Sequence, residues 1–349
     1  MTRRIALLGA GLIGREHATL IEAHPGAKLA GIADTSQAAR DYAASLGVPF
    51  NADYASLLDE LRPDGAIVAL PNHLHVPAGL ACIERGVPCL VEKPVADSLE
   101  AAHRLVVASE QRGIPVLVGH HRRHSPDIRE ARRIVRDGLL GDLVAVNGMC
   151  WFDKPDAYFE AEWRRTEGGG PLLINLIHDI DALRFICGEI ESVRAFTSNA
   201  ARGFAVEDTA SVAIRFESGV LGTFSVSDAV ASPWSWELTS AQALYFPHQP
   251  GAYLFLGGRK ASLSVSDMYL WRHDVPGGHW QDKLIREHKP LDPSRAYVNQ
   301  LEHFLAVIGG NAAPAITARD GMLTLAATVA VATSAREDRT VVVRELVAF

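Results

Sequence analysis

Three glycines near the start of the chain have the spacing of a loop that binds phosphate groups. They form G-x-G-x-x-G between the apolar run 5–8 and a segment compatible with a helix. In a strand–turn–helix, the first glycine permits a tight turn, the second lets a pyrophosphate approach the backbone, and the third lets helix and strand pack closely. Free N–H groups at the helix start then hold the phosphates. The predicted cofactor contacts of this loop are Gly9, Gly11, Leu12, Ile13 and Gly14.

An acidic residue stands at the end of the second predicted strand. This residue is Asp34, twenty positions after Gly14. A carboxylate in that place accepts hydrogen bonds from a ribose 2′-hydroxyl and would repel a 2′-phosphate. The sequence therefore predicts NAD as cofactor, with NADP as the alternative because Arg40 follows downstream. A glycine-rich turn that binds nothing is the competing interpretation, and the context of Asp34 disfavours it.

A lysine held between an acid and a proline follows a later predicted strand, in Glu92-Lys93-Pro94. Because proline restricts the backbone beside it, Lys93 is well placed to donate a hydrogen bond to a substrate oxygen and to stabilise charge there. An ordinary turn with an exposed ion pair is the alternative. The loop L-P-N-H-L-H at 70–75 also follows a strand, so it is predicted at the same sheet edge, where doubly wound folds bind ligands.

A second group of polar residues lies on a predicted helix after the glycines at 168–170. Asn175, His178 and Asp181 are three apart and fall close to one helix face. An imidazole with an amide and a carboxylate nearby can orient a hydroxyl and move its proton. A capped core histidine is the plainer alternative. A metal site on His178 and Asp181 is disfavoured by the glycine-rich entry and the absence of a second histidine cluster.

The elements that position these residues divide the chain in two. Helical and strand-like segments alternate over the first 120 or so residues, which predicts βαβ units and a parallel sheet. From Leu143 the strands alternate apolar and polar residues, which predicts a mainly antiparallel sheet with one face packed. We therefore expect an α/β doubly wound Rossmann domain over 1–122 and an α+β domain with a large open sheet over 123–349. Within the second domain we expect loops with short strands over 247–293, helices over 297–308 and 320–334, and a final strand over 340–346.

Bulk properties exclude several classes of protein. A chain of 349 residues with 48% apolar and 21% charged residues is typical of a globular protein with two domains. A formal charge of −7 gives no sign of a surface that binds nucleic acid or anionic membranes. The four cysteines are scattered and form no C-x-x-C motif. No apolar run is long enough to span a bilayer, and none has the features of a cleaved signal peptide. We therefore expect a cytoplasmic protein with reduced thiols and no metal.

Taken together, these motifs resemble the Gfo/Idh/MocA family of NAD(P)-dependent oxidoreductases over nearly the whole chain. The resemblance is carried by G-A-G-L-I-G at 9–14, Asp34, L-P-N-H-L-H at 70–75, E-K-P at 92–94, R-R-H-S-P at 122–126, G-G-G-P-L-L at 168–173 with His178 and Asp181, and S-P-W-S-W-E at 232–237. It implies a carbohydrate-like substrate, usually a sugar, cyclitol or related polyol, lying between the domains against the nicotinamide. It also implies a homodimer or homotetramer formed through the open sheet.

The resemblance assigns roles to individual residues. Lys93 would contact the reacting oxygen and His178 would relay its proton. Residues implied near the cofactor, besides the glycine loop and Asp34, are Leu70, Pro71, Asn72, His75, Glu92, Lys93 and Arg123. Residues implied at the substrate are Asn175, Arg123, Trp163 and Asp181. Tyr158, Trp234 and Trp236 are further candidates for stacking on a sugar, and core or interface aromatics are the alternative for all four rings.

One position departs from the family pattern. Inositol-dehydrogenase-like members carry an Asp four residues before the histidine, and Ile174 occupies that position here, followed by Asn175. An amide can hold a hydroxyl but cannot take its proton, so the base would be His178, with help from Lys93. The predicted activity is hydride transfer between NAD(H) and a secondary alcohol. A glycosidase that uses NAD transiently and a non-catalytic dinucleotide-binding regulator remain the alternatives.

Overall fold

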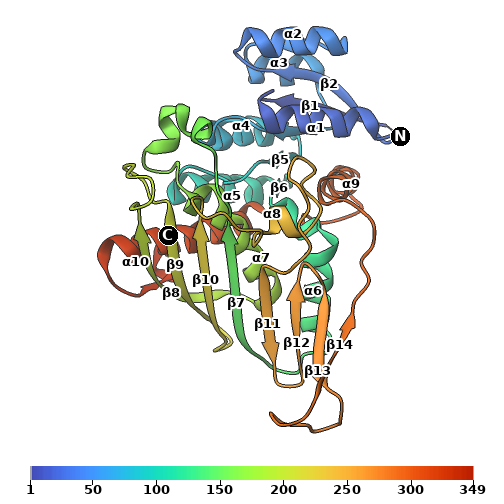
Figure 1. The fold of residues 1–349 in the computed structure, drawn as a ribbon. Helices are drawn as coiled ribbons and strands as arrows, with labels where there is room; N and C mark the ends of the chain where they lie inside the picture. Colours follow the sequence, from blue (N-terminus) through green and yellow to red (C-terminus); the bar gives the residue numbers. More distant parts are fainter. Residues whose placement is uncertain (1, 349) are drawn as a thin grey trace. The chain divides into compact units, whose positions relative to one another are not determined.

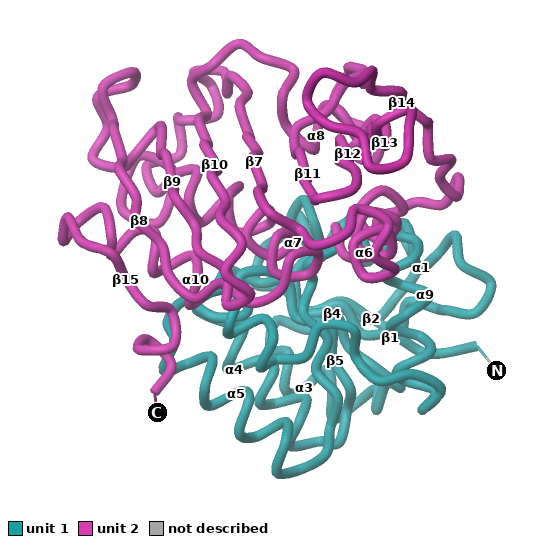
Figure 2. Tube along the Cα trace, turned by 90° about the horizontal axis from the view of Figure 1, so that it is seen from below, with its two compact units in different colours: residues 1–121, 297–325 teal, residues 122–296, 326–349 magenta. Residues whose placement is uncertain are grey.

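The chain divides into two compact units in a computed structural model that describes residues 2–348. The first unit comprises the residues up to His121 together with Tyr297–Leu325, and the second comprises Arg122–Ala296 and the residues from Ala326 onward (Figure 2). Our expected domains met at 122/123 and placed the whole remainder in the second domain. The structure instead groups 297–325 with the first unit. The physical reason is that Thr317 forms a bridge with Leu117, and the N–H of Val118 donates to Ile316 O at 2.9 Å.

The first unit is built on a six-stranded parallel sheet with strand order β3-β2-β1-β4-β5-β6. This is the order of a doubly wound dinucleotide-binding fold. Strands β1, β2, β5 and β6 of this sheet are labelled in Figure 1. The strands are β1 Arg3–Leu8, β2 Ala27–Ala33, β3 Phe50–Asn51, β4 Gly65–Val68, β5 Cys89–Val91 and β6 Val116–Val118. The helices are α1 Leu12–Ala23, α2 Gln37–Leu46, α3 Tyr54–Leu61, α4 Asn72–Glu84, α5 Leu99–Arg112 and α9 Ala296–Ile308, whose first residue lies in the second unit. The α/β prediction is confirmed.

The predicted helix ends have clear local causes. Ser36, Asp53 and Ser98 precede α2, α3 and α5, and each side chain accepts a hydrogen bond from a backbone N–H of the first turn. Gly47 and Gly113 end α2 and α5 with positive φ angles of 65°, which a glycine adopts without cost. The central strands are continuous apolar runs because both faces of this sheet are covered.

The second unit contains a nine-stranded sheet with strand order β14-β13-β12-β11-β7-β10-β9-β8-β15. Its strands are β7 Leu143–Trp151, β8 Ile190–Ser198, β9 Thr209–Phe216, β10 Leu221–Ser227, β11 Leu254–Gly258, β12 Ala261–Val265, β13 Tyr269–His273, β14 Leu284–His288 and β15 Val341–Val342. All neighbours pair antiparallel except β7 and β10, which are parallel. The mainly antiparallel sheet is confirmed, and 247–293 contributes four of its strands.

The helices of this unit are α6 Pro126–Arg136, α7 Ile177–Cys187 and the short α8 Trp236–Thr239; α10 Ala318–Glu337 belongs to it from Ala326. The expected final strand over 340–346 is wrong beyond Val342, where a 3₁₀ turn over Val343–Val347 follows. Val342 pairs with Ser192, and β8 begins only two residues earlier, at Ile190. The residues after Val342 therefore soon pass the end of β8, where no strand is left to pair with them. Within residues 2–348, no helix has the length and apolar character needed to cross a membrane.

Candidate functional site

The glycine loop between β1 and α1 has the geometry that its sequence predicts. Gly9 has φ +96°, and a Cβ there would lie 2.4 Å from Ala69 O. A Cβ on Gly14 would lie 2.1 Å from Gly9 O, so helix and strand touch through the missing side chain. A Cβ on Gly11 would meet no atom within 4 Å. Gly9 and Gly14 are thus required by the fold. Gly11 leaves open space at the helix start, and this space fits a diphosphate group.

Asp34 follows β2 and holds the glycine loop. Its carboxylate accepts hydrogen bonds from Ala10 N at 2.9 Å and from Ser36 N at 2.8 Å. Burial alone would raise the pKa of Asp34, but these N–H donors outweigh it and the pKa lies below its usual range. The carboxylate is therefore ionised at neutral pH and keeps lone pairs for a ribose hydroxyl. Arg40 places its guanidinium over the Phe50 ring, 4.7 Å from the centroid.

His75 joins two loops at the same sheet edge. Its Nε2 lies 2.7 Å from Leu70 O and its Nδ1 lies 2.7 Å from Pro94 O. The ring is 1% exposed, and burial lowers its pKa, while the two carbonyl oxygens oppose that shift because each accepts only from a ring N–H. His75 therefore positions the two loops through their backbone carbonyls. Leu70 and Pro71 lie in the first of these loops, and the exposed Asn72 begins α4.

Glu92 is buried and pairs with a residue that sequence patterns did not single out. Its Oε1 lies 2.8 Å from His17 Nε2 on α1, and both side chains are less than 10% exposed. Burial would raise the pKa of Glu92, but His17 outweighs it and the pKa is lowered. A Cβ on Gly119 would lie 2.9 Å from this carboxylate, so Gly119 provides its space. The pair fixes the start of the loop that carries the half-buried Lys93.

In the second unit, Asn175 and His178 lie where a π-helical turn passes into α7. Leu172–Leu176 is π-helical and α7 begins at Ile177. Such single π turns often occur at functional sites. Glu207 Oε1 accepts from Leu172 N at 3.1 Å, and Gly170 leaves room for that carboxylate. Asn175 and His178 are 8% and 7% exposed.

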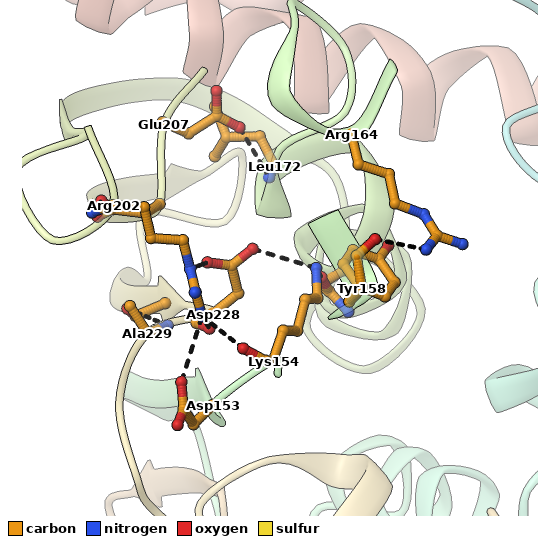
Figure 3. A network of polar contacts seen from close by, with 12 residues as sticks. Asp153, Lys154, Tyr158, Arg164, Leu172, Arg202, Glu207, Asp228 and Ala229 are labelled. Atoms are coloured by element: carbon orange, nitrogen blue, oxygen red, sulfur yellow. Dashed lines mark hydrogen bonds and ion pairs between the residues drawn. The ribbon is translucent and has the colours of Figure 1, made fainter. Parts of the chain in front are cut away.

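Lys154 forms hydrogen bonds to Asn175 and to Asp228, and Figure 3 shows it beside Asp228. Its ammonium donates to Asn175 Oδ1 at 2.9 Å and to Asp228 Oδ2 at 3.2 Å. Burial lowers the pKa of Lys154, and Asp228 opposes that shift. Arg202 Nε donates to the other Asp228 oxygen at 3.0 Å. Asp228 therefore bridges two cations through its two carboxylate oxygens.

The parallel pairing of β7 with β10 explains why Lys154 and Asp228 meet. Trp151 at the end of β7 pairs with Ser227 at the end of β10. Parallel neighbours end at the same sheet edge, so the residues just after each strand lie together. The sequence analysis did not identify Lys154, Asp228 and Arg202 as site residues. The alternating strands predicted an antiparallel sheet, and neighbouring antiparallel strands end at opposite edges of the sheet. The available signal was that Lys154, like Lys93, directly follows a strand.

Two predicted site residues are bound to each other. Arg123 Nε and Nη2 donate to the two oxygens of Asp181 at 2.7 Å each, and the residues are 7% and 0% exposed. The adjacent Arg122 binds Asp179 at 2.5 Å and Glu237 at 2.6 Å. These buried pairs fasten the segment after β6 to α7. The structure thus gives Arg123 and Asp181 a positioning contact.

The predicted aromatic residues are dispersed over different environments. Trp236 is 2% exposed beneath the Arg122 guanidinium, so it belongs to the core. Trp234 packs against Trp151, with ring centroids 5.8 Å apart. Trp163 is 53% exposed. The Lys154 ammonium lies 4.8 Å from the centroid of the Tyr158 ring. Among residues 2–348, no three metal-binding side chains gather as a metal site requires.

Comparison with known proteins agrees with this geometry. Residues 3–120 match the profile of an oxidoreductase family described as an NAD-binding Rossmann fold, and residues 128–243 match the GFO/IDH/MocA C-terminal domain. Both profiles describe domains of one family.

Individual proteins are similar over much of the chain. The 1,5-anhydro-D-fructose reductase of Ensifer adhaerens is 28% identical over 95% of this chain and 96% of its own length. Inositol 2-dehydrogenase 2 of Saccharopolyspora erythraea is 32% identical, and the match spans 63% of this chain and 65% of the relative. A solved WlbA dehydrogenase from Bordetella pertussis, in complex with NADH and UDP-GlcNAcA, has a TM-score of 0.81 at 23% identity and covers 98% of this chain and 99% of its own.

Proposed function

Because this chain belongs to the Gfo/Idh/MocA family of NAD-binding oxidoreductases, we propose that it oxidises or reduces a secondary alcohol of a sugar, cyclitol or related polyol. The similar proteins named above support this substrate class, since one is a reductase of an anhydrosugar and another a dehydrogenase of inositol. NAD(H) accepts or supplies the hydride in this reaction.

The observation that carries the proposal is the loop at the end of β1. Gly11 leaves space for a diphosphate, and the ionised Asp34 stands at the strand end where a ribose is recognised. The groups that would hold the cofactor are the backbone of 9–14, Asp34, and the loops that carry Leu70, Pro71, Asn72 and Lys93. His75 and Glu92 act on it through the loops that they fix.

The residues proposed for proton transfer are Lys93 and His178. Lys93 donates to the reacting oxygen and stabilises charge that develops on it, and His178 takes or returns the hydroxyl proton. Asn175 and Trp163 are proposed to bind substrate, while the Arg123–Asp181 pair holds α7, the helix that carries His178. In this scheme the second unit carries substrate recognition.

The test is steady-state kinetics with NAD and NADP against a panel of neutral sugars, cyclitols and sugar acids. We expect kcat/KM to favour NAD at least tenfold, and Asp34→Ser to reduce that preference. Lys93→Met and His178→Asn should each lower kcat by roughly 10²- to 10⁴-fold, while Lys28→Met, at an exposed position on β2, should not. A clear preference for NADP, or full activity without Lys93 and His178, would contradict the proposal.

The proposal includes a homo-oligomer and a cytoplasmic location. The outward-facing side of the large sheet exposes Phe196 and Leu221, which are 63% and 58% accessible. A second copy of this chain covering that face would remove them from water. Cell fractionation with an antibody against the chain tests the location.

A further inference from the structure

Lys154 fixes the direction in which the Asn175 amide points. An ammonium group only donates hydrogen bonds, so the Asn175 atom 2.9 Å from it must be the oxygen. The Asn175 NH₂ group therefore faces away from Lys154. Asn175 consequently presents a donor to whatever binds beside it.

A second cation lies next to Lys154 across one aromatic ring. Arg164 places its guanidinium 3.9 Å from the Tyr158 centroid, and the Lys154 ammonium lies 4.8 Å from the same centroid (Figure 3). Arg164 Nη1 donates to Tyr158 O at 2.6 Å, and its buried Nε has no hydrogen-bond partner among residues 2–348. A half-buried guanidinium with an unsatisfied N–H group can bind an anion.

The charges around Asn175 favour the same kind of ligand. We call Lys154, Tyr158, Arg164, Asn175 and Asp228 the Lys154 cluster; it holds two cations and one carboxylate. That carboxylate also pairs with Arg202. Ile174 brings no charge, and Asp179 and Asp181 on α7 are bound to buried arginines. The carboxyl group of Glu207 accepts from Leu172 N, and burial raises its pKa.

We propose that the Lys154 cluster recognises a carboxylate on the substrate, so that the preferred substrate is a sugar acid such as a uronate or an aldonate. This inference rests on the proposed function and specifies its substrate class. Arg164 attracts the carboxylate, and the Asn175 NH₂ group, held by Lys154, donates to one of its oxygens.

The experiment is calorimetric titration of the NADH-loaded protein with matched pairs, glucuronate against glucose and galacturonate against galactose. We expect each acid to bind at least tenfold more tightly than its neutral partner. Arg164→Gln should weaken binding of the acids roughly 10- to 100-fold and leave the neutral sugars unchanged. Arg165→Gln, at the exposed neighbouring position, is the matched control and should change neither.

Asn175→Asp is the complementary variant. It keeps the shape of the side chain and the acceptor for Lys154, but it replaces the donor with a negative charge, so the preference for acids should disappear. Equal binding of acids and neutral sugars by the unmodified protein, or equal weakening of both by Arg164→Gln, would overturn the inference. Turnover of neutral sugars without an acid preference would leave the proposed function intact, whereas acid binding without any NAD-dependent turnover would contradict the function alone.

Discussion

At the scale of single residues, the glycines of the β1–α1 loop serve different purposes. Gly9 and Gly14 are in contact with backbone atoms of the folded chain, whereas Gly11 borders open space. Their spacing alone predicted all three as cofactor contacts, because a motif records the positions without separating fold from binding. The structure distinguishes the glycines that the fold requires from the glycine that leaves space for a ligand. Alanine at Gly11 and alanine at Gly14 are therefore expected to have different effects on binding and on stability.

Gly11→Ala should bind NADH at least roughly tenfold more weakly, about 1.4 kcal/mol of binding free energy, and melt at the same temperature as the parent. Its φ of −68° suits alanine, and its methyl group meets no protein atom. Gly14→Ala should lose about 1–3 kcal/mol of unfolding free energy, because its Cβ overlaps Gly9 O and α1 must shift. Thermal unfolding and NADH fluorescence titration measure both quantities. A destabilised Gly11→Ala that binds NADH normally would contradict this assignment.

Asn175 shows how far a sequence can predict a site residue. Its type and spacing from His178 suggested a substrate contact, and the missing acid at Ile174 suggested a change in chemistry. The direction of the amide could not be predicted, because it depends on Lys154, which precedes it by 21 positions along the chain.

At the scale of elements, the site depends on contacts between segments that are distant in sequence. His17 on α1 and Glu92 after β5 are 75 positions apart. The strand order explains why these two residues meet, because α1 begins at the sheet edge where the loops after neighbouring strands lie. Local patterns predicted the helix and the strand, but nothing in either segment indicates that His17 faces Glu92.

The His17–Glu92 pair should give the protein an acid-sensitive contact. The folded-state pKa of Glu92 lies below the ordinary value of 4.5, so the ionised Glu92 carboxylate stabilises the fold above that pH, and this contribution is lost as the pH falls through the lowered pKa. Glu92→Gln should cost about 1.5–3 kcal/mol at pH 7, and the difference from the parent should shrink between pH 5 and 3. Denaturant unfolding at several pH values measures this, with the exposed Glu100→Gln as control. A difference that does not vary with pH would contradict the ionic contribution.

At the scale of the whole molecule, the alternation of the second unit predicted a sheet with one packed face. The buried alternates and the exposed outer face confirm that pattern. The return of 297–325 to the first unit could not be predicted, because helical periodicity identifies the apolar face of α9 without identifying the sheet that it covers. Within the first unit, Phe304 and Ile308 of this helix pack against Gly65 of β4.

The exposed outer face leads to a prediction about assembly. The parent protein should sediment as a dimer or tetramer at micromolar concentration, and Phe196→Glu with Leu221→Glu should shift it to monomer, because two buried charges would oppose association. Leu244→Glu, at an exposed loop position, should leave the assembly unchanged. Analytical ultracentrifugation measures the masses, and a monomeric parent would exclude association through this face.

The parallel pairing of β7 with β10 also bears on how the chain folds. Lys154 and Asp228 meet across 74 positions, and the segment between these strands carries Tyr158, Arg164, Asn175 and His178. Closing so long a loop is entropically costly and is repaid only once the strands pair. The ion pair therefore forms after local helices and hairpins, and a probe at Tyr158 or Trp163 should gain its native fluorescence later than the bulk of the secondary structure. The groups proposed to recognise substrate are then among the last parts of the molecule expected to become ordered.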